Sequence, residues 1–319
     1  MSQTTSLDTG VTDSVTALIG HTPLLRLRRF EHEVCTGVEL YAKAEWQNPG
    51  GSVKDRAAIR MVLEGERAGL LTAGKTILDA TSGNTGIAYA MIGAARGYPV
   101  TLCMPENVTP ERKRILRAYG AEIVFTNPLE GSDGAIRAVR AMYESDPDRY
   151  FYPDQYSNPS NPRAHYLTTA PELWEQTGGK LTHFVAGLGT TGTVMGTGRR
   201  LKELNPAIQI VAVEPAEPMH GLEGLKHLGS SIIPPIYDPA LHDRKLSITT
   251  DAGWDMTDRL LKDEGLAVGH SSGAALAGAY QVARELSEQG EKGRVVAVFC
   301  DRADRYFEPG RPAPRFPYR

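Results

Sequence analysis

Lys54 is the residue whose neighbours most strongly indicate covalent chemistry. It follows a Pro-Gly-Gly turn in the segment NPGGSVKDR, residues 48–56. Residues 55–71 carry apolar side chains at helical spacing, so Lys54 is predicted to lie at a helix N-terminus. The backbone dipole there disfavours positive charge, which makes the amine easier to deprotonate, and a neutral amine can form a Schiff base with an aldehyde. Taken alone, a lysine is more often a solvated surface residue.

A turn rich in glycine and threonine, GLGTTGT at residues 187–193, is suited to a phosphate group. Its glycines let the backbone approach a ligand, and its N–H groups and hydroxyls can donate to phosphate oxygens. The turn also reads G-x-G-x-x-G, and Glu214 follows Gly192 by 22 positions, as in nicotinamide-dinucleotide sites. Three threonines within four positions favour a compact monophosphate, and a dehydrogenase would leave Lys54 without a role. A turn that only packs a helix on a strand is the third reading.

Two further turns combine small residues with hydroxyl-bearing residues. Residues 81–86 (TSGNTG) follow a predicted strand and offer hydroxyls, an amide and a helix start, which suit a small carboxylate. Residues 269–275 (GHSSGAA) place Ser272 at another helix start, where its hydroxyl can cap the helix or hydrogen-bond a ring nitrogen. Plain helix capping is the alternative for both turns.

The turns join strands to helices in an α/β pattern. Strands are predicted at residues 76–80, 100–104, 121–125, 183–186, 208–213 and 294–299, with helices at residues 87–95, 110–119 and 193–204. Strands rich in Val and Ile that alternate with helices indicate parallel sheets covered on both faces. In such sheets ligands bind where strand ends meet helix N-termini.

The composition narrows the class of protein. The chain has 319 residues, of which 41% are apolar and 23% charged, with a net charge of -3. The length suggests roughly two domains. The charge argues against nucleic acid as a partner, and no apolar run approaches the roughly 20 residues of a membrane span. The N-terminus lacks a signal peptide, and Cys35, Cys103 and Cys300 form no metal pattern, so we expect a cytoplasmic protein without a metal site.

In this order, the four turns resemble those of the fold-type II pyridoxal-phosphate enzymes, and most closely the cysteine synthase and cystathionine β-synthase family. The resemblance runs from about residue 16 to about residue 307, and the N-P-x-x-S-x-K-D-R and T-S-G-N-T-G motifs are highly specific in combination. It implies two doubly wound parallel-sheet domains of the tryptophan synthase β-like architecture. The smaller, substrate-side domain would span residues 48–158, and the larger, cofactor-binding domain residues 1–47 plus 159–319.

The resemblance also implies roles for individual residues. The cofactor would be pyridoxal 5'-phosphate, with Lys54 as the catalytic residue that carries it. Asn84 would reach the ring hydroxyl and Ser272 the ring nitrogen. The residues that would hold the cofactor phosphate are Gly189, Thr190, Thr191, Gly192 and Thr193. The residues that would hold the substrate carboxylate are Thr81, Ser82, Asn84, Thr85 and Gln155.

The implied reaction is that of a cysteine synthase, a transferase with lyase-like chemistry. Lys54 would remove the α-proton of O-acetylserine or O-phosphoserine, the β-substituent would leave to give an α-aminoacrylate, and a sulfur nucleophile would add. A neutral serine at the ring nitrogen makes a weaker electron sink than a carboxylate, which favours prompt loss of the leaving group. Thr191, at a position where the family often has glycine, resembles the B-type and O-phosphoserine-using cysteine synthases. Cystathionine β-synthase and diaminopropionate-type synthases, which use other nucleophiles, remain alternatives.

The resemblance also leads to expectations about Lys226, the substrates and the oligomeric state. Lys226 lies in the loop 219–228 (MHGLEGLKHL), where relatives line the active-site mouth, and it can bind a substrate phosphate or be a solvated loop lysine. The partners implied are an amino-acid substrate and a sulfur donor, which is free sulfide, thiosulfate or a carrier protein ending in a thiocarboxylate. Relatives are usually homodimers, so we expect a homodimer.

Overall fold

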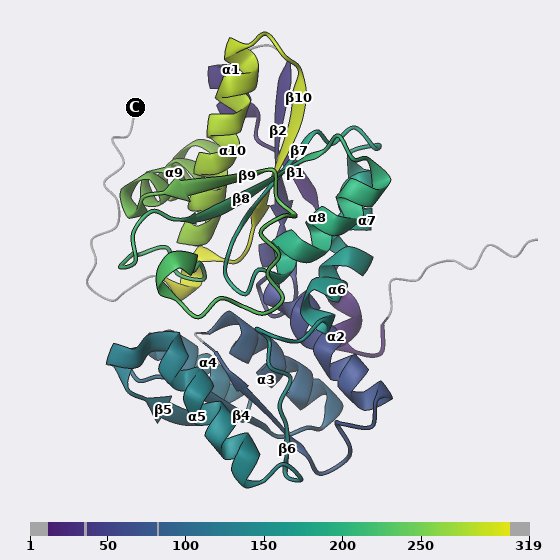
Figure 1. Cartoon of the computed structure of the whole chain (residues 1–319), viewed down its shortest axis with the longest axis vertical. Helices are drawn as coiled ribbons and strands as arrows, with labels where there is room; N and C mark the ends of the chain where they lie inside the picture. Colours follow the sequence, from purple (N-terminus) through teal and green to yellow (C-terminus); the bar gives the residue numbers. More distant parts are fainter. Residues whose placement is uncertain (1–11, 35–36, 82, 307–319) are drawn as a thin grey trace, which may run out of the picture.

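The computed structural model describes residues 12–34, 37–81 and 83–306, which form two β-sheets covered by helices. The larger sheet forms the upper part of the molecule in Figure 1 and the smaller sheet the lower part. This is the α/β class with parallel-stranded sheets that the sequence predicts. None of the helices in the described ranges is both long and apolar enough to cross a membrane.

The larger sheet has six strands and is parallel except at one edge. In spatial order its strands are β1 (Leu24–Arg26), β2 (Val38–Ala44), β10 (Gly293–Phe299), β7 (His183–Gly187), β8 (Gln209–Pro215) and β9 (Arg244–Ile248). Strand β1 pairs with β2 in the antiparallel sense, and the other neighbours are parallel. Parallel neighbours need crossover connections, which run through α-helices except between β8 and β9.

The smaller sheet has four parallel strands. In spatial order they are β5 (Glu122–Thr126), β4 (Val100–Pro105), β3 (Thr76–Ala80) and β6 (Tyr150–Phe151). All of them fall inside the range 48–158 expected for the smaller domain, whose limits remain a prediction.

The helices alternate with the strands along the chain. The α-helices are α1 (Arg28–Val34), α2 (Lys54–Arg67), α3 (Asn84–Arg96), α4 (Pro110–Ala118), α5 (Gly131–Ser145), α6 (Ser160–Leu167), α7 (Thr169–Gln176), α8 (Gly192–Leu204), α9 (Thr250–Glu264) and α10 (His270–Glu288). Short 3-10 helices are η1 (Val15–Leu18), η2 (Glu45–Gln47), η3 (Pro128–Glu130), η4 (Leu228–Ser230) and η5 (Ala303–Arg305).

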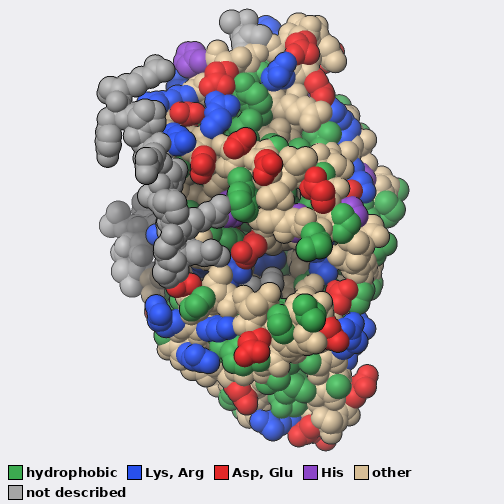
Figure 2. Space-filling view, turned by 90° about the vertical axis from the view of Figure 1, so that its left-hand side faces the viewer, with side chains coloured by type: hydrophobic (Ala, Val, Ile, Leu, Met, Phe, Trp, Pro, Cys, Tyr) green, Lys and Arg blue, Asp and Glu red, His purple; other side chains and the backbone are tan. Residues whose placement is uncertain are grey.

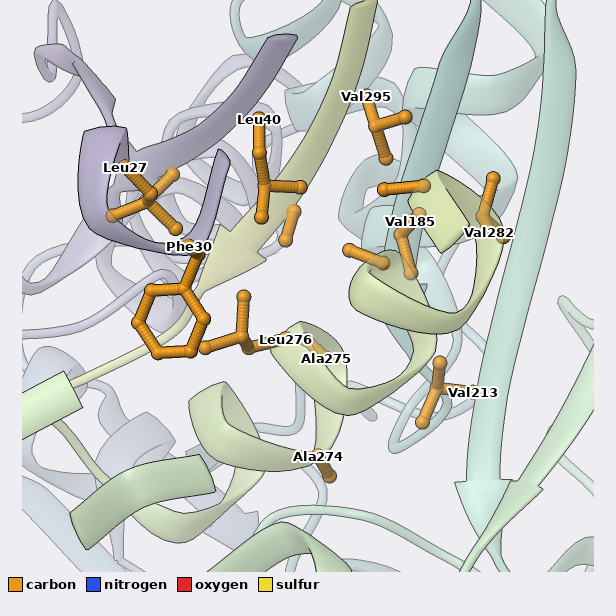
Figure 3. Packing of buried hydrophobic residues seen from close by; sticks show 14 of the residues in the cluster. Leu27, Phe30, Leu40, Val185, Val213, Ala274, Ala275, Leu276, Val282 and Val295 are labelled. Atoms are coloured by element: carbon orange, nitrogen blue, oxygen red, sulfur yellow. The ribbon is translucent and has the colours of Figure 1, made fainter. Parts of the chain in front are cut away.

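Alternate residues of the central strands face opposite sides of the larger sheet, as the two-residue repeat of a strand requires. Val185 and Val295 pack on one side with Leu276 of α10, as Figure 3 shows. Phe184 and Val296 face the other side, in the cluster that contains residues of α7 and α8. The smaller sheet is built in the same way, with α2, α3 and α4 on one side and α5 on the other. The inner strands β3, β4, β7, β8 and β10 are therefore buried on two faces, which explains their nearly continuous apolar sequences.

The strands predicted from sequence agree with β3, β4, β5, β7, β8 and β10 to within two residues, and the predicted helices agree with α2, α3, α4 and α8 to within four residues. The sequence patterns did not identify β1, β2, β6 or β9, or most of the remaining helices. Cys35 and Ser82, which the sequence analysis singled out, lie outside the described residues.

Candidate active site

A cavity of about 400 Å³ lies between the two sheets and brings most of the predicted site residues together. Figure 2 shows the surface hollowed between the upper and lower parts of the molecule. The predicted residues in its lining are Lys54, Asn84, Thr85, Gln155, Gly189, Thr190 and Lys226. Lining residues that sequence reasoning missed include Arg112, Ser132, Tyr156, Glu223 and Tyr306.

Lys54 is the first residue of α2, as predicted, and its place is fixed by the turn before it. The N–H of Gly50 donates to Oδ2 of Asp55 at 2.6 Å, and the N–H of Val53 donates to the carbonyl of Cys300 at 2.8 Å. A Cβ on Gly50 would meet the Asp55 carboxylate at 2.5–2.9 Å, so this turn requires glycine. Asp55 therefore stabilises the Pro-Gly-Gly turn by its hydrogen bond to Gly50, and the neighbouring Lys54 lines the cavity.

Arg56, the last residue of the lysine motif, belongs to a buried charge cluster instead of the cavity lining. Its guanidinium pairs with Glu45 at 2.7 Å and with Glu172 at 2.7 Å, and Lys43 pairs with Glu172 at 2.6 Å. Burial alone would raise the pKa of Glu172, but the hydrogen bonds and charges of Arg56 and Lys43 lower it to about 2. The cluster ties α2 to β2, η2 and α7, and so anchors the helix that carries Lys54.

The turn after β3 is held by Thr81. Its Oγ1 accepts hydrogen bonds from the N–H groups of Gly83 at 3.1 Å and Gly86 at 3.0 Å. Thr81 is not among the residues that line the cavity, and its hydroxyl shapes the turn. Thr85 lines the cavity, and its hydroxyl donates to Oε1 of Gln155 at 2.7 Å. The two predicted carboxylate contacts Thr85 and Gln155 are therefore linked.

Asn84 begins α3 and is fixed by residues near the end of the described chain. Its Nδ2 donates to Oδ2 of Asp301 at 2.6 Å, and its Oδ1 accepts a hydrogen bond from Arg305. Tyr306 donates to the same Asp301 carboxylate and lines the cavity, and Arg112 of α4 lies 5.1 Å from its ring centroid. More than 200 positions separate Asn84 from Asp301, and no sequence pattern indicated this contact.

The turn at residues 187–193 has the shape of an anion cradle. Helix α8 begins at Gly192, and Thr191 before it adopts a left-handed conformation with φ of 72°. A Cβ on Gly189 would lie 2.3 Å from the carbonyl oxygen of Gly224, and one on Gly192 would lie 2.0 Å from Oδ1 of Asn161, so both positions require glycine. The Thr191 hydroxyl is buried and has no protein partner among the described residues. An orphaned hydroxyl and a helix N-terminus fit a phosphate.

Thr190 and Thr193 are oriented by polar side chains from α6. Asn161 donates to Oγ1 of Thr190 at 3.0 Å, which leaves the threonine proton free to donate elsewhere. Nε2 of His165 lies 3.3 Å from Oγ1 of Thr193, and its Nδ1 lies 2.9 Å from Oγ1 of Thr169. Burial, together with the charge of Arg56, lowers the pKa of His165 to about 3. His165 is therefore a neutral partner of the turn at physiological pH.

Ser272 lies in the first turn of α10 and is fully buried. Its Oγ accepts a hydrogen bond from the N–H of Cys300 at 3.0 Å, so its own proton can be donated to another acceptor. Such a donor suits an unprotonated ring nitrogen. Ser272 is not among the cavity-lining residues, and its contact with a ring nitrogen stays a prediction.

Lys226 is a cavity residue, not a solvated loop lysine. Its ammonium lies 3.2 Å from Oγ of Ser132, 3.6 Å from Oδ1 of Asp133 and 5.1 Å from the ring centroid of Tyr156. Burial lowers its pKa, and the Asp133 carboxylate opposes that shift. An anionic group entering the cavity can therefore meet Lys226 beside the N-terminus of α5.

We expect Asp55 to make the stability of the protein depend on pH near neutrality. Burial raises its pKa to about 7 from an ordinary value of 3.8, although the Gly50 N–H and Arg305 oppose the shift. Between pH 3.8 and about 7 the folded chain therefore binds more protons than the unfolded chain. The stabilisation from protonated Asp55 is fully present below the unfolded pKa and is lost as the pH rises through about 7. The free energy of unfolding of Asp55→Asn, relative to that of wild type, should therefore rise by about 2 kcal/mol from pH 5 to pH 8.

Urea unfolding of wild type and Asp55→Asn at pH 5, 6, 7 and 8 measures this difference. The control is Asp148→Asn, which changes an exposed carboxyl group. A difference in unfolding free energy that stays constant across the series for Asp55→Asn would contradict the prediction.

The chain is similar to known proteins over most of its length. The family model described as pyridoxal-phosphate dependent enzyme matches residues 15–301. Cysteine synthase of Aquifex aeolicus is 51% identical over 295 residues, covering 92% of this chain and 90% of the relative. Cysteine synthase B of Pseudomonas aeruginosa is 44% identical, covering 93% and 96%. The crystal structure of an O-acetylserine dependent cystathionine beta-synthase from Helicobacter pylori superposes with a TM-score of 0.87 at 38% identity, covering 94% of this chain and 98% of that one.

Proposed function

The chain belongs to the family of pyridoxal-phosphate-dependent enzymes, and from this premise we propose that it is a cysteine synthase. It would replace the β-substituent of O-acetylserine or O-phosphoserine with a sulfur nucleophile. The observation that carries the proposal is that Lys54, Thr85 with Gln155, and Gly189 with Thr190 line one shared cavity. The family membership argues against a nicotinamide-dependent oxidoreductase, and Glu214, which that reading needed, pairs with Lys245 at 2.7 Å.

The residues of the cavity and of the adjoining turns would have different roles in such a reaction. Pyridoxal phosphate, when bound, supplies an electron sink for the α-carbon of an amino acid. Lys54 would hold it covalently, and its amine, once released, would move the proton at the substrate Cα. The turn at residues 189–193 would hold the phosphate with its N–H groups and hydroxyls. Ser272 would donate to the ring nitrogen as a neutral partner.

The substrate carboxylate would lie at the N-terminus of α3. There Gln155 can donate with its side-chain amide, while the hydroxyl of Thr85 already donates to Gln155. Asn84 would approach both this carboxylate and the ring. The smaller domain, residues 48–158, would then carry the substrate contacts, and residues 1–47 plus 159–319 most of the cofactor contacts.

A spectrum and a product assay test the proposed function. The purified protein should absorb near the wavelengths of bound pyridoxal phosphate, and borohydride should bleach it and add the reduced cofactor mass to Lys54. With O-acetylserine the holoenzyme should make cysteine from sulfide. A colourless protein that neither binds the cofactor nor releases acetate would overturn the proposal.

Cystathionine β-synthase activity is the second candidate, because the similar Helicobacter pylori structure is that of an O-acetylserine dependent cystathionine beta-synthase. Product analysis with homocysteine in place of sulfide separates the two. Cystathionine formed at a rate equal to or above that of cysteine would favour the second candidate.

Lys226 should affect the choice of leaving group. Because its ammonium lines the cavity beside Ser132 and Tyr156, Lys226→Ala should lower kcat/KM for O-phosphoserine relative to O-acetylserine by about tenfold. Initial rates with each serine ester measure the ratio. Lys180→Ala, an exposed lysine, is the matched control. An unchanged ratio in Lys226→Ala would remove Lys226 from substrate binding.

We also propose that the enzyme works as a cytoplasmic homodimer. The reduced state expected for its widely spaced cysteines and the assembly of relatives support this. Light scattering of the purified holoenzyme gives the mass, and a particle of one chain would contradict the dimer. Assays with sulfide, thiosulfate and a thiocarboxylated carrier protein would show which sulfur donor is used.

A further inference from the structure

Asp79 is a fully buried carboxylate at the end of β3, next to the turn that is proposed to bind the substrate carboxylate. Its Oδ1 accepts the N–H of Ala80 at 2.8 Å. Its Oδ2 accepts the hydroxyl of Tyr89 at 2.9 Å and the N–H of Gln155 at 3.3 Å. Two of these three donors are backbone groups beside the cavity, from segments 75 positions apart.

Gln155 is held at both of its backbone polar atoms and at both ends of its side-chain amide. Its N–H donates to Asp79, and its carbonyl accepts from Nδ2 of Asn161 at 2.7 Å. Its Nε2 donates to the carbonyl of Ala80, and its Oε1 accepts from Thr85. Asp79 therefore accepts hydrogen bonds from the N–H groups of Gln155 and Ala80, and the carbonyl of Ala80 in turn orients the Gln155 side chain.

We propose that Asp79 is a positioning residue for the substrate carboxylate. It fixes Ala80 and Gln155 relative to one another, so that the second N–H of the Gln155 side-chain amide is directed at one place in the cavity. The inference rests on the proposed function, because it takes the α-carboxylate of an amino acid to bind at Gln155.

An ionised carboxylate is the group that this arrangement needs. All three partners donate to it, and only a carboxylate accepts on both oxygens. An asparagine would keep its oxygen toward the Ala80 N–H and turn its NH₂ group toward the Tyr89 hydroxyl, which can accept, so the buried Gln155 N–H would lose its acceptor.

The groups around Asp79 explain why the charge is costly to keep. They are Tyr89 of α3, Cys103 of β4, and Tyr152, Asp154 and Tyr156 on either side of Gln155. Burial raises the pKa of Asp79 to about 7, and the charge of Asp154 acts in the same direction, while the three hydrogen bonds lower it. A fold that needed only packing at this position would not require a buried carboxylate.

The test compares Asp79→Asn with Tyr89→Phe. Both variants disturb the same carboxylate, but Tyr89→Phe removes a donor that has no contact with Gln155 or Ala80 among the hydrogen bonds of the described residues. Asp79→Asn should raise KM for the amino-acid substrate about tenfold, the value of one lost hydrogen bond, with kcat changed by less than about threefold. KM for sulfide should not change. Tyr89→Phe should leave all three parameters within about twofold of wild type.

Two readouts that do not need turnover accompany the kinetics. Hydrogen exchange of the segment 150–158 should be faster in Asp79→Asn than in Tyr89→Phe, because the Gln155 N–H loses its acceptor. Calorimetry of the holoenzyme with L-alanine and with ethylamine, which lacks the carboxylate, should show that Asp79→Asn loses about tenfold in its preference for L-alanine.

The outcomes separate this inference from the proposed function. If Asp79→Asn and Tyr89→Phe raise KM and hasten exchange equally, Asp79 is only structural and the inference is wrong. Unchanged affinity for L-alanine in Asp79→Asn overturns it as well. Wild-type holoenzyme that binds no amino acid would instead contradict the proposed function.

Discussion

Replacing Lys54 by alanine should lower the rate of β-replacement by at least about 10³-fold while leaving the fold intact. Lys54 is the first residue of α2 and lines the cavity between the sheets, so its amine can reach both a cofactor and a substrate held there. Its removal takes away the covalent attachment of the cofactor and the group that moves the proton at the substrate Cα. Initial rates with O-acetylserine and sulfide measure the loss.

Two variants serve as controls for this result. Lys54→Arg places another long basic side chain at the helix start but cannot form the covalent link, so it should be as inactive as Lys54→Ala. Lys226→Ala removes the other lysine that lines the cavity. It should retain the borohydride-reducible link to Lys54, seen as the cofactor mass on the peptide that contains residue 54. Activity of Lys54→Ala within about tenfold of wild type would refute the assignment.

Replacing Arg56 by methionine should lower the free energy of unfolding by about 3–5 kcal/mol. The Arg56 side chain is 1% exposed and pairs with Glu45, whose side chain is 0% exposed, and with Glu172. Without the guanidinium, Glu45 is a buried carboxylate whose remaining partners are the hydroxyl of Thr22 and the amide of Asn48. Thermal and urea unfolding measure the loss.

A matched control lies one helical turn further along α2. Arg60 pairs with Glu64 at 2.7 Å, with its side chain 20% exposed, and Arg60→Met should cost less than about 1 kcal/mol. The double variant Glu45→Gln, Arg56→Met should recover part of the stability, because no uncompensated carboxylate at residue 45 then remains buried. Equal losses for Arg56→Met and Arg60→Met would show that the buried cluster contributes no more than a surface pair.

The lysine motif shows which features a local sequence pattern can predict. Glycine and proline predicted the turn, and the apolar spacing predicted the helix, so the position of Lys54 at the helix start could be predicted from sequence. The roles of Asp55 and Arg56 in the same motif could not. Asp55 contacts Gly50 within the motif, yet its burial depends on the whole fold, and Arg56 pairs with a glutamate 116 positions away.

Strands β2 and β9 could not be predicted from sequence, because charged residues interrupt their apolar pattern. Strand β2 contains Glu39 and Lys43 among its apolar residues, which obscures the pattern of a central strand. Lys43 is buried there because Glu172 of α7 lies 2.6 Å away. Strand β9 begins with two adjacent charged residues, Arg244 and Lys245, and lies at a sheet edge, where its apolar pattern is short and weak.

The sequence by itself determined the α/β class, the order of four glycine-containing turns and the lysine at a helix start, because these depend on short-range backbone preferences and apolar periodicity. The tertiary structure decided which side chains share the cavity. It brought Asp301 and Arg305 to Asn84, placed Arg112 and Tyr306 in the cavity lining, and set Asp79 against Gln155. Those contacts join residues far apart in the chain, and they form only when both sheets have packed and buried the charges between them.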